Sequence, residues 1–236
     1  MKIGLFADSH YCSKELLGTN RRPVLSYNKI KDSVGEFMLN GVDLIVCLGD
    51  LIDDDGEMSR NILNLERVGK LINESGVESI CCMGNHDAVL FTNDEFERIS
   101  GIKTAPATLA RDDIRLIFLD ANYAKDGVRY NSQNNDWTDS NITENGINAL
   151  AHTLSTCFES KIVVFSHQNI DPSVEPRHMI KNAAKVRKIL SDDGRITAVY
   201  QGHYHPGAEN NIDNIEYITL KAMCTGTENF YKIIEI

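Results

Sequence analysis

The sequence predicts an α/β fold in a soluble globular chain. Short apolar runs alternate with segments whose apolar residues recur at helical spacing, a pattern typical of α/β proteins. The chain has 236 residues, of which 42% are hydrophobic and 25% charged, so it is long enough to bury a sizeable core. Because it shows no internal repeat and no linker, we expect one domain over residues 1–236.

The alternating pattern defines the individual elements. We expect strands at Lys2–Ala7, Asp43–Leu48, Val77–Met83, Arg115–Leu119, Lys161–Ser166, Thr197–Gln201, Ile215–Leu220 and Phe230–Ile236. We expect helices at Tyr27–Leu39, Glu57–Glu74, Thr143–Thr156 and His178–Leu190. Asn40-Gly41 gives the first helix a good C-terminal stop. Asn141 and Glu144 resemble a capping box for the third helix.

Composition and charge exclude several classes of protein. The net charge of -10 and the lack of a Lys/Arg block argue against a surface for nucleic-acid polymers. No apolar stretch approaches the ~18 residues that a membrane span requires, and no targeting segment is visible. The six cysteines lack disulfide-framework or zinc spacing, so we interpret them as buried, reduced thiols in a cytoplasmic protein. Adjacent Cys81 and Cys82 are expected on opposite faces of a strand.

Polar residues collect where the expected strands end. Five apolar strands each deliver Asp, Asn or His at their carboxyl ends, the edge of an open α/β sheet where ligands bind. The clusters are Asp8-Ser9-His10, Gly49-Asp50, Gly84-Asn85-His86-Asp87, His167 and Gly202-His203-Tyr204-His205. Five of the seven histidines lie in these clusters, and their gathering is poorly explained by isolated structural roles.

These residue types suit a definite chemistry. Imidazole and carboxylate together suit Mn, Fe, Zn or similar divalent ions. A carboxylate such as Asp50 has two oxygens and can bridge two metals, and two ions roughly 3.5–4 Å apart clamp the attacking and leaving oxygens of a phosphoryl displacement. Glycines 49, 84 and 202 permit sharp turns and close approach of the backbone. The site would stay positive within an acidic protein and so attract phosphate.

The whole set resembles the calcineurin-like metallophosphoesterase superfamily, with matching order and spacing from residue 8 to residue 205. The resemblance implies an αββα sandwich, in which two mixed sheets are flanked by helices. It implies two divalent metal ions (Mn, Fe, Zn or a mixture), one bound by Asp8, His10 and His205, the other by Asn85, His167 and His203, with Asp50 bridging them. It further implies that a metal-bridging hydroxide attacks phosphorus, that His86 is the catalytic histidine, and that Asp87 orients His86.

Secondary motifs look nearest to the manganese-dependent ADP-ribose/CDP-alcohol diphosphatases. These motifs are Arg21-Arg22, Gly49-Asp50-Leu51-Ile52-Asp53, Phe165-Ser166-His167 with Asp171-Pro172, Lys181-Asn182, and Gly202-His203-x-His205 leading into Ile218-Thr219-Leu220. The chain departs from that group at Pro206, where an Asp is usual, and some members carry Gln at the place of His10. We therefore expect a small, nucleotide-like phosphodiester or diphosphate as substrate. Cyclic-nucleotide or glycerol phosphodiesterases are the nearest alternative.

Two alternatives from other classes also stay open. A non-enzymatic scaffold of the same fold usually lacks some ligands, and here all positions are filled. A protein Ser/Thr phosphatase usually has Gly-Asn-His-Glu and additional arginines, whereas Asp87 stands in the Glu position here.

Several residues keep two interpretations. The Asn-rich segment 121–141 is either functional or a solvated excursion pinned by its aromatic residues. Arg21 and Arg22 either grip a distal phosphate or belong to a solvated loop. Asp53 either supports the site or caps a loop, and His178 either reaches substrate or lies in solvent.

Overall fold

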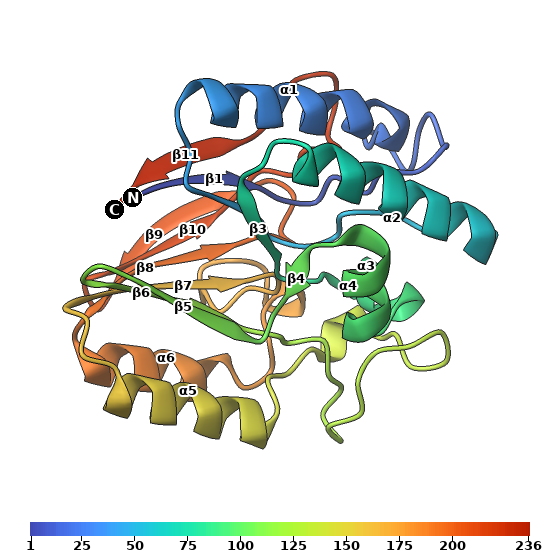
Figure 1. The fold of residues 1–236 in the computed structure, drawn as a ribbon. Helices are drawn as coiled ribbons and strands as arrows, with labels where there is room; N and C mark the ends of the chain where they lie inside the picture. The colour runs from blue at the N-terminus through green and yellow to red at the C-terminus, as the bar shows by residue number, and fades with distance from the viewer.

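Two β-sheets lie face to face, and helices cover the outer face of each (Figure 1). The computed structural model describes residues 1–236. The first sheet has the order β11-β1-β2-β3-β4 and consists of β1 (Lys2–Phe6), β2 (Leu44–Cys47), β3 (Glu78–Cys81), β4 (Lys103–Thr104) and β11 (Lys232–Glu235). The second has the order β5-β6-β7-β8-β10-β9 and consists of β5 (Ala107–Arg111), β6 (Ile114–Phe118), β7 (Lys161–Ser166), β8 (Ile196–Gln201), β9 (Ala208–Ile212) and β10 (Ile215–Thr219).

The helices form the two outer layers. They are α1 (Ser26–Leu39), α2 (Met58–Asn73), α3 (Asn85–Leu90), α4 (Asn93–Ser100), α5 (Glu144–Thr156) and α6 (Ala183–Asp193), with short 3₁₀ helices η1 (Pro23–Leu25), η2 (Trp137–Asp139) and η3 (Pro176–His178). In Figure 1, α1 and α2 lie above the first sheet, α5 and α6 lie below the second, and the two termini lie side by side. The predicted αββα sandwich is confirmed.

Alternation along the strands divides the core into three layers. Ile3 and Leu5 face the space between the sheets, where Phe118 and Phe165 stack with ring centroids 4.9 Å apart. Phe6, on the opposite face of β1, packs under α1 and α2. A third cluster fills the space between the second sheet and α5 and α6. Because the central strands β1, β2, β7 and β8 are buried on both faces, they show continuous apolar runs rather than alternating ones.

The same alternation separates the adjacent cysteines. Cys81 packs in the cluster under the helices, whereas Cys82 packs between the sheets, which confirms their predicted placement on opposite faces. All six cysteines are buried free thiols.

Most strands of each sheet are parallel. β1 to β4 run parallel, as do β6, β7, β8 and β10, whereas β11, β5 and β9 pair antiparallel to their neighbours at the edges. The carboxyl ends of the parallel strands in a sheet therefore meet at one edge, where the polar clusters were predicted.

The element predictions succeed within a few residues, with defined exceptions. α1 ends at Leu39 with Asn40 as its C-cap, and Gly41 adopts a φ of 63°, which agrees with the predicted stop at Asn40-Gly41. The predicted fourth helix begins at Ala183 rather than His178, which belongs to η3. The capping residue of α5 is Thr143, whose Oγ1 accepts a hydrogen bond from the Gly146 N–H at 3.0 Å, so the predicted cap at Asn141 is wrong.

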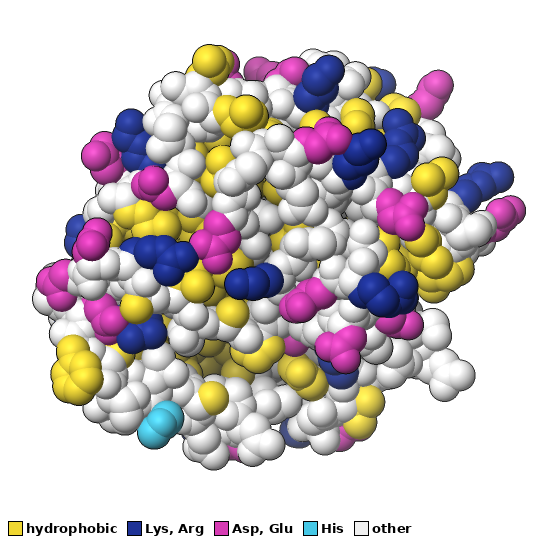
Figure 2. Space-filling view, viewed as in Figure 1, with side chains coloured by type: hydrophobic (Ala, Val, Ile, Leu, Met, Phe, Trp, Pro, Cys, Tyr) yellow, Lys and Arg dark blue, Asp and Glu magenta, His cyan; other side chains and the backbone are white.

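The exterior shows mixed charge on the face drawn in Figure 2. Lys and Arg side chains are interspersed there with Asp and Glu, and no basic stripe crosses this face. None of the helices has the length and apolar character needed to cross a membrane.

Candidate metal centre

The folded chain brings together all the predicted metal ligands. Asp8 and His10 follow β1, Asp50 follows β2, Asn85 begins α3 after β3, His167 follows β7, and His203 and His205 follow β8. Six of these side chains are buried, and only His205 keeps substantial exposure, at 29% of its side chain. Two stacked sheets therefore contribute to one cluster at the carboxyl ends of their strands.

The first group of donors contains Asp8, His10 and His205. The Nε2 atoms of His10 and His205 face each other at 3.2 Å. Asp8 Oδ1 lies 3.5 Å from His205 Nε2 and 3.9 Å from His10 Nε2. Three side-chain donors from two strand ends thus converge on one point.

The second group contains Asn85, His167 and His203. His167 Nε2 lies 3.3 Å from Asn85 Oδ1, while its Nδ1 donates to the carbonyl of Leu48 at 2.7 Å. That backbone contact fixes the orientation of the ring and leaves Nε2 free for a ligand. His203 Nε2 is buried without a hydrogen-bond partner, although an unsatisfied buried polar atom is costly. A divalent cation would satisfy it.

Asp50 lies between the two groups. Its Oδ2 is 3.4 Å from His10 Nε2 and 3.5 Å from His167 Nε2. Its Oδ1 accepts a hydrogen bond from the His86 N–H at 2.9 Å. One carboxylate therefore faces both clusters of imidazole donors, as a bridging ligand must. The nitrogen and oxygen donors fit two borderline divalent ions.

Backbone strain is concentrated in this cluster. Asp8, His10, Asp50 and His203 have φ values of 53°, 47°, 50° and 66°, a left-handed conformation that is uncommon for residues other than glycine. Gly84 is required for another reason: a Cβ there would collide with the backbone and carboxylate of Asp50. The sequence predicts close approach of the backbone at Gly84, and the structure shows this close approach to Asp50.

His86 lies beside the donors and is more accessible than they are. Its side chain is 34% exposed, and its Nδ1 donates to Asp53 Oδ1 at 3.0 Å. Asp53 also lies 3.5 Å from His10 Nδ1 and 3.8 Å from Arg21 Nη1. Asp53 thus joins the candidate catalytic histidine to the cluster. Its Oδ1 also accepts a hydrogen bond from the Asp54 N–H at 2.8 Å, so Asp53 makes the contacts of both interpretations.

The prediction that Asp87 orients His86 is wrong. The Asp87 carboxylate is fully buried and accepts hydrogen bonds from the backbone N–H groups of Leu51, Ile52 and Gly84, at 3.0 to 3.2 Å. It cannot face His86 because it points back into the turn that begins α3. Asp87 therefore fixes the loop after β2 to α3, and Asp53 is the carboxylate that accepts a hydrogen bond from the His86 ring.

Burial and charge divide the histidines into two kinds. Burial lowers the pKa of His10 and lowers that of His203 well below the usual value, so both rings are neutral near pH 7. Burial also opposes protonation of His167, but the charges of Asp50 and Asp8 and the Leu48 carbonyl raise its pKa to about 10. For His86, Asp50 and Asp53 overcome burial and raise the pKa to about 9.

The segment between β6 and α5 reaches the cluster. The Trp137 ring packs 5.3 Å from His203 and 5.1 Å from His178 between centroids. His178 in turn packs 5.1 Å from His203, and its side chain is only 16% exposed, so the interpretation of His178 as a solvated surface histidine is wrong. The aromatic content of the segment was the available sequence signal.

Cys224 is a neighbour of the centre that the sequence did not reveal. Its sulfur belongs to one group of close donor atoms with His10 and His205, all within 4.8 Å of one another. The contact arises because Cys224 N donates to the carbonyl of Asp8 at 3.0 Å. No spacing motif connects residues so far apart.

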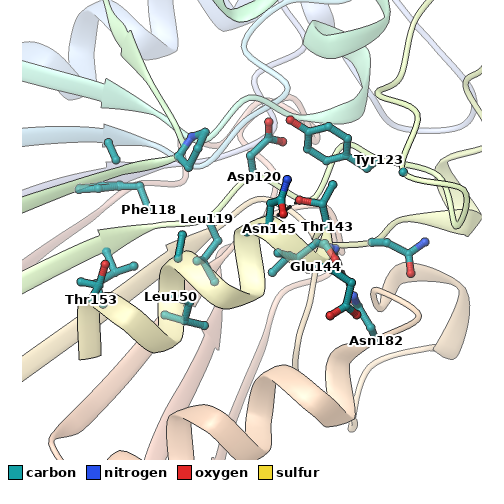
Figure 3. Close-up of a pocket in the computed structure, with 18 of the residues that line it drawn as sticks. Phe118, Leu119, Asp120, Tyr123, Thr143, Glu144, Asn145, Leu150, Thr153 and Asn182 are labelled. Atoms are coloured by element: carbon teal, nitrogen blue, oxygen red, sulfur yellow. Dashed lines mark hydrogen bonds between the residues drawn. The ribbon is translucent and has the colours of Figure 1, made fainter. Parts of the chain in front are cut away.

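A large cavity of about 1080 Å³ lies away from the donors, on the helix side of the second sheet. Figure 3 shows Phe118, Leu119 and Leu150 on its apolar side, and Asp120 and Tyr123 at its opposite end. It contains none of the predicted metal ligands. The segment 121–141 therefore contributes to both places: Tyr123 lines this cavity, and Trp137 packs on His203 in the cluster.

The αββα fold and the converging nitrogen and oxygen donors define the class of metal-dependent hydrolases. The calcineurin-like phosphoesterase family model matches residues 1–207, and the chain belongs to this family. It is therefore a metal-dependent phosphoesterase, and the family implies divalent ions in a dinuclear site. The resemblance predicted from the sequence is confirmed at this level.

Solved structures share the fold. The chain resembles a dimetal phosphatase from Danio rerio, with a TM-score of 0.82 and 19% identity over 98% of this chain and 91% of that chain. It also resembles a putative 5'-nucleotidase from Staphylococcus aureus, with a TM-score of 0.60 and 12% identity over 94% and 48% of the two chains. A phosphopantetheinyl hydrolase from Mycobacterium tuberculosis has a TM-score of 0.54 and 9% identity over 94% and 89%. No curated protein sequence matches significantly.

Proposed function

We propose that the chain hydrolyses phosphodiester or diphosphate bonds of small nucleotide-like substrates with two bound divalent ions. The position of Asp50 is the observation that carries this proposal. Its carboxylate lies within 3.5 Å of imidazole nitrogens from both donor groups. Asp8, His10 and His205 would hold one ion, and Asn85, His167 and His203 the other, with Asp50 shared.

The donor set favours Mn, Fe, Zn or a mixture of these ions, because imidazole and carboxylate suit borderline divalent metals. Two such ions would supply positive charge for the phosphoryl oxygens and make a water molecule more acidic. The two carboxylates Asp8 and Asp50 offset only part of that charge. The site then attracts an anionic phosphate although the chain has a net charge of -10.

His86 is the proposed acid of the reaction. Its pKa of about 9 keeps the imidazole protonated near neutral pH, and the side chain is exposed enough to reach a substrate. Asp53 holds Nδ1, which leaves Nε2 to donate a proton to the leaving oxygen or to stabilise charge on the phosphoryl group. Arg21, partly exposed beside Asp53, is positioned to contact a second phosphate of a diphosphate.

The proposal is tested by reconstituting metal-free protein with Mn, Fe, Zn or Mg. Each form is assayed against ADP-ribose, CDP-alcohols, cyclic nucleotides and glycerophosphodiesters. We expect hydrolysis of at least one diester or diphosphate with two bound ions per chain. The matched control is Phe158→Ala, because Phe158 is 97% exposed and belongs to none of the donor groups.

The panel also decides between the alternatives. Preference for cyclic nucleotides or glycerophosphodiesters over diphosphates would assign the alternative phosphodiesterase activity. Absence of hydrolysis of every substrate would refute the proposal, and less than one bound metal ion per chain in the same protein would favour an interaction scaffold.

A further inference from the structure

The segment between β6 and α5 holds one aromatic side chain against the metal cluster. Tyr130 anchors this segment: it is 2% exposed, and its hydroxyl donates to the Asp136 carbonyl at 3.0 Å and contacts Ser140 Oγ at 2.8 Å. Asp136 Oδ1 accepts from the N–H of Thr138 at 3.0 Å and so begins η2. Trp137 therefore has a defined position. The residues before it in the loop are polar and mostly exposed, and Thr138 and Asp139 after it are polar and half-buried.

Trp137 belongs to a compact group of rings on one side of the centre. Trp137, His178 and His203 lie mutually within 5.1 to 5.3 Å between centroids, and Tyr204 packs 5.2 Å from His178. Because His203 is a proposed metal ligand, this group lies directly beside the place where a phosphoryl group would bind. Its other members, Trp137, His178 and Tyr204, contribute flat aromatic surface.

The indole is not sealed in the core. Trp137 remains half-buried, in contrast to Tyr130 in the same segment. The Arg177 guanidinium lies 5.9 Å from its ring centroid, and the Arg177 side chain is 63% exposed. A ring that only supported His203 could be fully buried. A partly exposed indole beside a cationic side chain can instead stack on a planar ring that carries a phosphate.

We propose that Trp137 and His178 form a stacking surface for the nucleobase of a nucleotidyl substrate, beside the metal site that contains His203. This inference rests on the proposed function and narrows its substrate class to phosphodiesters or diphosphates that carry a base. Stacking on an aromatic side chain contributes about 1–3 kcal/mol per base and is tolerant of base identity. The surface therefore selects for a base rather than for one particular base.

Trp137 is the only tryptophan in the chain, so its fluorescence reports this surface directly. Zn-loaded protein, excited at the red edge of indole absorption, is titrated with AMP and separately with ribose 5-phosphate. These probes carry the same phosphate and differ in the base. We expect AMP to quench Trp137 and ribose 5-phosphate to leave it nearly unaffected. Equal effects of the two probes would overturn the proposal.

Kinetics test the same surface through substrate selectivity. The readout is the ratio of kcat/KM for a nucleotidyl diphosphate to that for a glycerophosphodiester without a ring. Trp137→Ala should lower this ratio about 5-fold or more, the factor that corresponds to ~1 kcal/mol, mainly through a higher KM for the nucleotide. Trp137→Phe should recover most of the ratio, and Phe158→Ala should leave it unchanged.

A purely supporting role gives a different result. If Trp137→Ala lowers both kcat/KM values equally, with fewer than two metal ions per chain by elemental analysis, Trp137 only positions His203 and the stacking surface is refuted. If the wild-type protein hydrolyses neither substrate, the proposed function fails, and the contrast between AMP and ribose 5-phosphate still decides whether a base binds.

Discussion

Replacement of Asp53 by Asn should impair catalysis through His86 rather than through the metal ions. Asp53 Oδ1 accepts from His86 Nδ1 at 3.0 Å, and its Oδ2 lies 3.5 Å from His10 Nδ1. Asn is nearly isosteric and keeps one acceptor oxygen, but it removes the negative charge that favours the protonated imidazole. The change therefore alters proton affinity with little change in packing.

The expected loss follows from the strength of that contact. A hydrogen bond to a charged partner contributes about 1.5–3 kcal/mol, and Asn retains part of it, so we expect kcat to fall about 10-fold. His86 has a pKa raised to about 9, with contributions from both Asp50 and Asp53. If protonated His86 acts as the acid, as proposed, activity falls as pH rises through its pKa in the metal-loaded protein, where the ions offset the contribution of Asp50. Loss of the Asp53 charge lowers the pKa and moves that fall to lower pH.

The assay is a pH profile of kcat at saturating metal, with metal content measured on the same samples. Asp87→Asn is the informative comparison because the Asp87 carboxylate contacts only backbone N–H groups around α3. This variant should lower the thermal midpoint and leave the position of the descending limb in place. If Asp87→Asn moves the limb and Asp53→Asn does not, the assignment of Asp53 as the orienting carboxylate is refuted.

Three further predictions concern the metal cluster. Asn85→Ala should reduce the bound metal from two ions per chain toward one and lower kcat/KM at least about 100-fold. Elemental analysis measures the metal content, and the hydrolysis assay measures kcat/KM. Unchanged values would contradict the metal site formed by Asn85, His167 and His203. Metal uptake at pH 7 should release at least one proton, because His167 has a pKa of about 10 in the metal-free protein whereas His10 and His203 are already neutral. A metal-bridging hydroxide formed from water would add a second proton. Calorimetry in buffers of different ionisation enthalpy measures the number of protons, and metal affinity should rise with pH. Gly84→Ala should destabilise the fold because the added Cβ would meet Asp50. In contrast, nothing lies within 4 Å of a Cβ added at Gly35, so Gly35→Ala should stabilise α1 by about 1 kcal/mol. The thermal unfolding midpoints of the two variants are compared with that of the wild-type protein.

The sequence predicts what local pattern determines. The strands that precede the ligands form apolar runs, and each run is followed directly by Asp, Asn or His. Both the strand and the following ligand can therefore be predicted from the sequence. β4 has only two residues, and β5 and β9 are edge strands with no buried residue. These three strands lack continuous buried apolar runs and were missed. α3 was missed because its first residues, Asn85 to Asp87, were interpreted only as a ligand motif.

Contacts between distant segments could not be predicted in this way. Asp53 and Asp87 are both carboxylates near His86 in sequence, and nothing in their spacing shows that the turn into α3 points Asp87 toward backbone N–H groups. Trp137 reaches His203 across 66 residues of sequence, and Cys224 reaches the Asp8 end of β1 across more than 200. The direction of such side chains depends on how loops from different strands lie against one another.

The strained backbone of the ligands explains how this arrangement is kept. Left-handed conformations of residues other than glycine cost of order 1–3 kcal/mol each, and Asp8, His10, Asp50 and His203 all adopt them. Hydrogen bonds between the strand ends offset this cost. The N–H groups of Asp8 and His10 donate to the backbone carbonyls of Gly49 and Asp50, at 2.9 and 2.8 Å. The His203 N–H donates to the Asp8 carboxylate at 3.0 to 3.1 Å. Because each ligand segment is hydrogen-bonded to another ligand segment, the fold itself orients the donor atoms toward common points. Metal binding then adds bonds to a cluster whose conformational cost has already been met, and this favours both tight binding and a fixed position for the phosphoryl group.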